Sequence, residues 1–73
     1  MPPLPVVSGR ETVAAFHALG WQVSRQRGSH IVLTKPWQPV TLSVPDHREL
    51  ASGTLRRLIR NAGITVDEFI AAL

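Results

Sequence analysis

His30 directly follows Gly28 and Ser29 and begins a β-branched segment within the stretch RQRGSHIVLTKP. Three cationic side chains lie close to it in the sequence: Arg25, Arg27 and Lys35. A histidine in a protein core needs a carboxylate or a carbonyl as partner, and cations supply neither. An imidazole exchanges protons near neutral pH, and cationic side chains bind phosphate groups. The pattern therefore indicates proton transfer beside a bound phosphate diester.

RNA is a phosphate diester that carries its own nucleophile, the ribose 2′-hydroxyl. Cleavage by internal attack needs a base or acid within hydrogen-bond reach and cations that meet the phosphate charge. Because this reaction requires no metal ion, one histidine with neighbouring arginines is enough for a slow ribonuclease. The alternative is a surface histidine without a chemical role, and the local residues leave both interpretations open.

His47, in the segment VPDHRELASGTL, is a second histidine that could carry protons or contact phosphate. The simpler interpretation, which we favour, is that it stabilises its loop by bonding a backbone group. His17 is expected to be structural. The spacing of the three histidines matches no zinc-binding pattern, and the acidic residues are not clustered as magnesium ligands. We therefore predict no metal site and no cofactor.

Arg56, Arg57 and Arg60 occupy the polar side of an amphipathic segment later in the chain. Most such faces are only solvated. This segment also begins with residues 52–54, whose free N–H groups at a helix start could hold a phosphate. The combination predicts RNA contacts, although an acidic protein surface would suit the same charges.

The two tryptophans have different sequence surroundings. Trp37 lies between Pro36 and Pro39, where its indole could stack on a base or cover a sheet edge. Trp21 is expected in the core.

The composition bounds the class of protein. The chain has 73 residues, which predicts one domain, and its 44% apolar content is typical of a globular protein. It contains no cysteine, and no apolar run approaches the length of a membrane span, so we expect a cytoplasmic protein without a membrane partner. Arginine supplies seven of the eight cations, the net charge is +3, and the pI of about 11.2 meets the first test for a nucleic-acid binder.

Helices are predicted on both sides of a central β region. Their expected bounds are residues 8–20, 52–63 and 66–73. Ser8 with Glu11, and Thr65 with Glu68, have the spacing of capping boxes. Ser52 is expected to cap the second helix. Residues 1–7, rich in proline, are expected to be an extended lead-in to a single domain at residues 8–73.

Three strands are predicted between the first two helices by alternating or β-branched residues. They span residues 21–26, 30–34 and 40–44. Trp21 and Val23 are expected to share the buried face of the first strand. In the second, Ile31 and Leu33 are expected to face the helices, so His30 would point away. The order α-β-β-β-α with a short C-terminal helix predicts an α+β domain: a three-stranded antiparallel sheet with helices on one face.

Two blocks of the sequence match a known pattern. The first is Gly28-Ser29-His30, followed by Pro36 after five residues. The second is VPDHRELASGTLRRLIRNAGI, residues 44–64, with its valine-proline, histidine, glutamate-leucine, glycine-threonine-leucine and alanine-glycine. Together with HALGW at the end of the first helix, these blocks resemble the HicA-type toxins, which are mRNA interferases of bacterial toxin–antitoxin pairs. The resemblance extends over about residues 8–69.

The resemblance implies a fold like that of double-stranded-RNA-binding domains, which agrees with the predicted element order. It also implies metal-independent cleavage of mRNA with His30 as the catalytic residue, and neutralisation by a HicB-type antitoxin that covers the active surface. The predicted RNA-binding residues are Arg25, Arg27, Gly28, Ser29, Lys35, His47, Arg56, Arg57 and Arg60.

The chain departs from the family pattern in its proline-rich start and in the loop KPWQP, which could alter which RNA is accepted. Two other functions compete with the endoribonuclease hypothesis. One is a non-catalytic RNA-binding module, possible for a degenerate toxin, and the other is a protein-interaction domain that binds no RNA.

Overall fold

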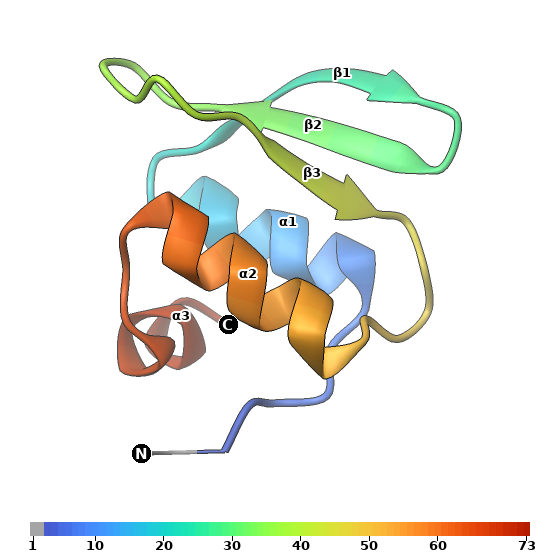
Figure 1. Cartoon of the computed structure of the whole chain (residues 1–73), viewed down its shortest axis with the longest axis vertical. Coiled ribbons are helices and arrows are strands. Elements are labelled where there is room, and N and C mark those ends of the chain that lie inside the picture. The colour runs from blue at the N-terminus through green and yellow to red at the C-terminus, as the bar shows by residue number, and fades with distance from the viewer. Residues whose placement is uncertain (1–2) are drawn as a thin grey trace.

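The computed structural model describes residues 3–73 and confirms the predicted α+β architecture. The elements are α1 (Gly9–Ala18), β1 (Gln22–Arg27), β2 (His30–Thr34), β3 (Leu42–Pro45), α2 (Ser52–Ala62) and α3 (Val66–Ala72). The three strands form one antiparallel sheet in the order β1-β2-β3. All three helices lie on the same side of this sheet, which leaves its other face uncovered (Figure 1).

The core lies between the helices and the covered face of the sheet. Its largest fully buried side chains are Trp21, Phe16, Phe69, Leu33, Leu42 and Leu55. The ring of Phe16 contacts both other aromatic rings, with centroids 6.4 Å from Trp21 and 5.4 Å from Phe69. Trp21 is therefore a core residue, as predicted, and Phe16 of α1 contacts both the middle of α3 and the residue that precedes β1.

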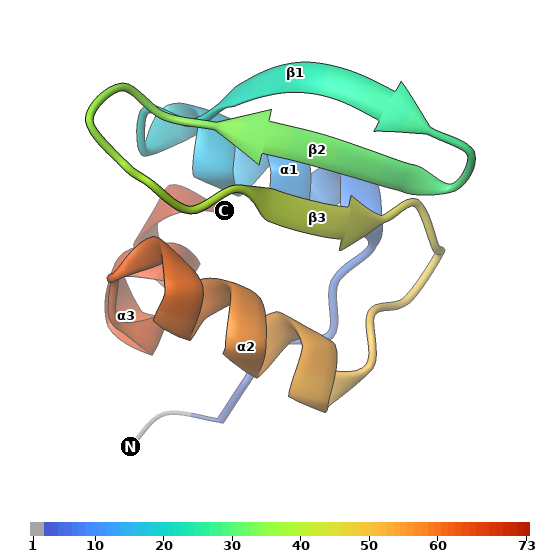
Figure 2. The ribbon, with the colours of Figure 1, turned by 45° about the horizontal axis from the view of Figure 1, so that its top comes forward.

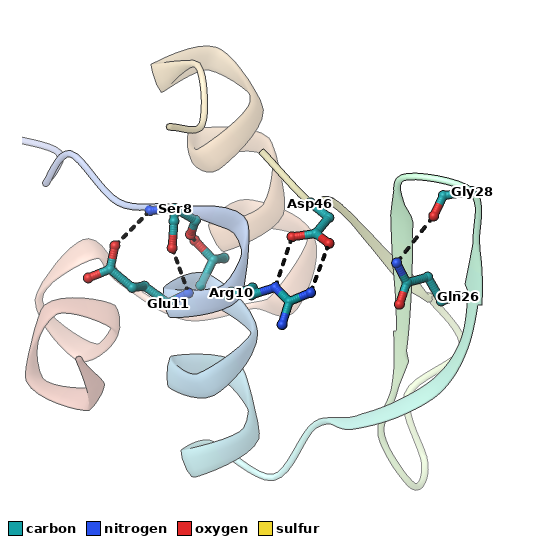
Figure 3. Close-up of polar contacts among 7 residues, drawn as sticks. Ser8, Arg10, Glu11, Gln26, Gly28 and Asp46 are labelled. Carbon is teal, nitrogen blue, oxygen red and sulfur yellow. Dashed lines mark hydrogen bonds and ion pairs between the residues drawn. The ribbon is translucent and has the colours of Figure 1, made fainter. Parts of the chain in front are cut away.

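The helix ends agree with the sequence prediction except at the start of α2. Both capping boxes are present, Ser8 with Glu11 (Figure 3) and Thr65 with Glu68. Gly20 and Gly63 follow α1 and α2 with φ values of 99° and 75°, a backbone region that favours glycine. The prediction for Ser52 was wrong, because Ser52 already belongs to α2.

The residue that caps α2 is Ala51, in an extended conformation and without a side-chain hydrogen bond. The helix starts one residue earlier than the serine would require, since the Ala51 carbonyl accepts the first helical bond, from the Leu55 N–H at 3.0 Å. An alanine cap stabilises a helix less than serine would.

The first strand differs from its prediction. Trp21 is buried, but Val23, expected on the same buried face, is 56% exposed. The strand β1 is an edge of the sheet, and α1 does not fully cover it. A shallow hollow remains beneath this edge, lined by Arg10, Val13, Val23, Gln26 and Ile31. The half-buried strand predicted from simple alternation is therefore exposed along its whole length.

The third strand is shorter at its start and longer at its end than predicted. It spans Leu42–Pro45, whereas residues 40–44 were expected. Pairing with β2 starts only at Leu42, opposite Leu33, and it includes Pro45, opposite His30. A proline is tolerated there because β3 is an edge strand, where its missing N–H does not break a ladder.

Of the predicted lead-in, residues 1 and 2 lie outside the described part of the chain, and residues 3–7 form no helix or strand. This segment nevertheless packs on the domain. Val7 is buried in the core, Leu4 is half-buried against it, and the Val7 carbonyl accepts a hydrogen bond from the Leu50 N–H at 2.9 Å.

Candidate active site

His30 is the first residue of β2 and is exposed on the uncovered side of the sheet. The burial of β2 alternates, with Ile31 and Leu33 buried against the helices and His30 and Thr34 exposed. This confirms the predicted orientation of the strand. We call the uncovered side the open face, which carries Arg25, Arg27, His30, Val32, Thr34 and Ser43.

Ser43 holds the imidazole of His30 from the neighbouring strand. The Nδ1 atom of His30 lies 3.2 Å from the Ser43 Oγ. Ser43 pairs with Val32, two residues beyond His30, so the two side chains are diagonal neighbours on the open face. When Nδ1–H donates to the hydroxyl, Nε2 carries the lone pair that a general base requires.

The sequence alone gives Ser43 no role, because it lies within a predicted strand and belongs to no motif. The register of β2 against β3 could have revealed it. Once Pro45 is paired with His30, Ser43 lies two positions earlier on β3, within reach of the imidazole. The register depends on the loop between β2 and β3, whose length alone does not specify it.

Two arginines on β1 share the open face with His30. Arg27 is directly opposite His30, and Arg25 is directly opposite Val32. Side chains of directly opposed residues project to the same face. The short β1–β2 turn at Gly28 and Ser29 therefore places Arg27 and His30 at opposed positions on the same face of the sheet.

A β-bulge places these arginines on the open face. The register shifts between Val23 and Arg25, so Ser24 is an extra residue in β1. Val23, before the bulge, pairs with the inward-facing Leu33, and unbroken alternation would also turn Arg25 inward. Bulges near functional sites redirect side chains in this way. This bulge places Arg25 and Arg27 on the face of the sheet that carries His30.

The turn beside His30 is fastened to the rest of the domain. Gly28 has φ 58° in a two-residue hairpin loop, where the first position favours glycine. The Ser29 carbonyl accepts a hydrogen bond from the Asp46 N–H, in the loop after β3, at 2.6 Å. In the same loop, the His47 carbonyl accepts a hydrogen bond from the Gly9 N–H of α1 at 2.8 Å. The side chain of Gln26 donates to the Gly28 carbonyl at 3.2 Å (Figure 3).

An ion pair adds a further link between α1 and the loop after β3. The Arg10 guanidinium contacts the Asp46 carboxylate through Nε at 3.3 Å and Nη2 at 3.4 Å (Figure 3). We call the region built from residues 27–30 and 45–47 the hairpin end of the sheet. His47 belongs to it: its side chain is exposed, and its backbone carbonyl accepts the hydrogen bond from the Gly9 N–H.

Lys35 lies away from His30. Lys35 follows the last residue of β2 and His30 is the first, so five residue steps, about 16 Å of extended chain, separate them. Its ammonium donates to the Leu19 carbonyl at the end of α1, at 3.0 Å. The predicted grouping of Lys35 with Arg25 and Arg27 around the histidine is therefore not what the fold produces.

The arginines of α2 also lie apart from the open face. The helix packs under β3 on the covered side of the sheet (Figure 2). Arg56 and Arg60 line a shallow hollow with residues of the α2–α3 connection, and Arg57 is exposed. Their contact with RNA stays a prediction, and an RNA strand on the open face would have to leave that face to reach them.

Within residues 3–73, no group of three histidine, cysteine, aspartate or glutamate side chains is arranged to hold a metal ion. In the same part of the chain, the helices are all too short or too polar to cross a membrane.

The sequence was also compared with known proteins. A family model described as the HicA toxin of bacterial toxin–antitoxin systems matches residues 9–64, from the start of α1 to the second residue after α2. This range contains the whole sheet, the hairpin end and the open face. No curated protein matches the chain. Because the family match covers most of the chain, the protein belongs to the HicA toxin family of bacterial toxin–antitoxin systems.

Proposed function

We propose that this toxin is an endoribonuclease that cleaves mRNA, with His30 as the catalytic residue. One observation carries the proposal: the imidazole is exposed on the open face, with the Ser43 hydroxyl 3.2 Å from its Nδ1 and Arg27 on the directly opposed position of β1. The contact to Ser43 orients the ring and leaves Nε2 for a substrate. The family supports a toxin, and the geometry supports proton transfer beside an anion.

The proposed reaction is attack by RNA on itself. Nε2 of His30 takes the proton of a ribose 2′-hydroxyl, the 2′-oxygen bonds to the adjacent phosphorus, and the bond from phosphorus to the 5′-oxygen breaks. The leaving oxygen takes a proton from water or from the imidazole of His47. The products are a 2′,3′-cyclic phosphate and a 5′-hydroxyl. Arg25 and Arg27 stabilise the charge that grows on the phosphate oxygens.

The test is cleavage of a purified single-stranded mRNA by the full chain in the presence of EDTA. Removing a proton-transfer group typically costs about 10² to 10⁴ in rate, so His30→Ala should cut that much more slowly while keeping its fold by circular dichroism. His17→Ala is the matched control, because it removes an exposed imidazole on α1 and should cut normally. A 2′,3′-cyclic phosphate among the products would support internal attack.

Two results would oppose the proposal. A His30→Ala variant that cleaves like the wild type would remove the catalytic role of this residue. Wild-type protein that binds the RNA and leaves it intact would instead favour a non-catalytic RNA-binding module.

The proposed partner that inhibits the toxin is a HicB-type antitoxin that covers the open face. The support is electrostatic: from Gln22 to Pro45 the chain has no aspartate or glutamate and three cations. An acidic antitoxin surface would be attracted to this region, and the association rate should fall as salt is added. Stopped-flow measurement of a rate that does not change with salt would contradict an acidic contact. With mRNA as the substrate, the proposed site of action is the cytoplasm.

A further inference from the structure

Trp37 is completely exposed, at 100% of its surface, whereas Trp21 is 1% exposed. It lies in the loop between β2 and β3, which projects beyond the sheet at the end opposite the hairpin (Figure 2). An indole is among the largest apolar groups a protein can bury. Because Trp37 buries nothing, it neither fills the core nor covers the sheet edge.

The backbone at Trp37 is strained as well. Its φ is 68°, and within residues 3–73 no other non-glycine residue has a positive φ. The Gln38 N–H donates to the Lys35 carbonyl at 3.1 Å and closes a four-residue turn with Pro36 and Trp37 in the middle. The third position of such a turn favours glycine or asparagine. A bulky side chain in that place opposes folding, and strain of this kind is often found at binding sites.

The loop restricts the backbone at Trp37. Pro36 and Pro39 restrict the backbone on both sides of Trp37. At the base of the loop, the Lys35 ammonium donates to the Leu19 carbonyl at 3.0 Å and ties the turn to the end of α1. A loop backbone restricted in advance loses less conformational freedom when a ligand binds.

The charge of the surrounding surface selects the ligand. The residues from Gln22 to Pro45, which include the whole sheet and this loop, carry no carboxylate, and they include Arg25, Arg27 and Lys35. An exposed aromatic ring next to a cationic sheet is the combination that binds single-stranded nucleic acid, with the ring stacked on a base and the cations near the backbone.

We infer that Trp37 forms a base-stacking subsite for single-stranded RNA, at the opposite end of the sheet from His30. The inference rests on the proposed function, since the RNA that stacks on Trp37 is the strand cut at His30. Domains that bind single strands on a sheet contact about 4–16 nucleotides, so one strand can reach both residues along the open face. Trp37 then determines which RNA is held and His30 determines where it is cut.

The test measures RNA binding separately from cleavage. The probe is a 2′-O-methyl RNA about 12 nucleotides long, which lacks the free hydroxyl needed for internal attack. Losing one stacking contact costs about 5- to 150-fold in affinity, so Trp37→Ala should weaken binding by that factor and Trp37→Phe should weaken it less. An abasic oligomer of the same length is the matched probe, and both variants should bind it like the wild type.

Three outcomes decide the inference. Equal affinity of wild type and Trp37→Ala for the base-carrying probe would overturn it. So would an equal loss on both probes, because the residue would then act on the backbone of the RNA. Trp37→Ala that binds RNA normally but binds its antitoxin weakly would overturn it in favour of a protein contact. Since the probe cannot be cut, a failure of the cleavage mechanism at His30 would leave these measurements unaffected.

Discussion

At one end of the sheet the chain turns from β1 into β2 through Gly28, and at the other it leaves β2 through Trp37. Both residues have a left-handed backbone, with φ values of 58° and 68°. Glycine adopts this conformation without steric cost, whereas a bulky residue is strained in it. A left-handed backbone is therefore needed at both ends of the sheet, and it is occupied by glycine at the hairpin end and by a strained tryptophan at the other end.

The two ends also differ in how they are attached. At the hairpin end, backbone hydrogen bonds join the turn to the loop after β3 and that loop to α1, at 2.6 and 2.8 Å. At the other end, the loop is tied to α1 by the side chain of Lys35. A proton-transfer group needs a fixed position, and the hairpin end supplies one. Residues whose backbone conformation opposes their local preference are expected at ligand-binding sites. Trp37 is such a residue.

The largest predicted effect comes from breaking the attachment of the hairpin end. A Cβ at Gly9 would overlap the carbonyl oxygen of Pro45. The Gly9 N–H also donates to the His47 carbonyl, so the backbone cannot move away without losing that bond. Gly9→Ala should destabilise the protein by about 3 kcal/mol, and thermal unfolding should show the melting temperature lowered by roughly 12–24 °C.

Gly53→Ala is the control for this substitution. Gly53 also lies in the first turn of a helix, but a Cβ there would meet no atom within 4 Å. Because alanine is a better helix former than glycine, the control should stabilise the protein by about 0.5–1 kcal/mol. A Gly9→Ala variant as stable as the control would mean that the contact between α1 and Pro45 is not tight.

A smaller effect is expected from freeing the ring of His30. Ser43→Ala removes the hydroxyl 3.2 Å from Nδ1 and should lower kcat of RNA cleavage by about 2- to 10-fold, the value of one hydrogen bond. Its KM and melting temperature should hardly change, because Ser43 is exposed on an edge strand. Steady-state kinetics with a fluorescent oligoribonucleotide would separate kcat from KM.

Ser43→Thr tests whether the hydroxyl or the packing matters. Threonine keeps the oxygen and is well suited to a strand, so this variant should recover most of the wild-type kcat. A threonine variant as slow as the alanine variant, or an alanine variant with normal kcat, would remove Ser43 from the mechanism as a positioning residue.

The parts of the structure that the sequence predicted depend on residues close together in the chain. The capping boxes of Ser8 and Thr65 each require a partner three residues away. The orientation of His30 follows from alternation within five residues of β2. The hairpin turn follows from a single glycine at a position that needs one. In each case the determining contact is local, so the pattern of residues is sufficient.

The parts that the sequence did not predict depend on pairing between distant segments. The bulge at Ser24 reverses which side of β1 faces outward, and only the register with β2 reveals it. The contact of Ser43 with His30 requires two strands to align across a loop. The partner of Lys35 is a carbonyl 16 residues earlier in the chain. The position of α2 on the covered side of the sheet is also not evident from the sequence, because an amphipathic pattern gives a polar side without saying where that side points.

The smallest predicted effect comes from relieving the strain at the other end of the sheet. Trp37→Gly removes a non-glycine residue from the left-handed region, worth about 1–2 kcal/mol, but adds the chain entropy of glycine, about 0.5–1 kcal/mol. The net gain should be about 0.5 kcal/mol, since the fully exposed indole contributes no burial, and the melting temperature should rise by roughly 2–4 °C. Thr41→Gly, an exposed residue of the same loop without a positive φ, should lower it. A Trp37→Gly variant that melts below the wild type would indicate that the indole stabilises the fold. The strained backbone at Trp37 would then no longer distinguish the loop end of the sheet, as a binding site, from the hairpin end.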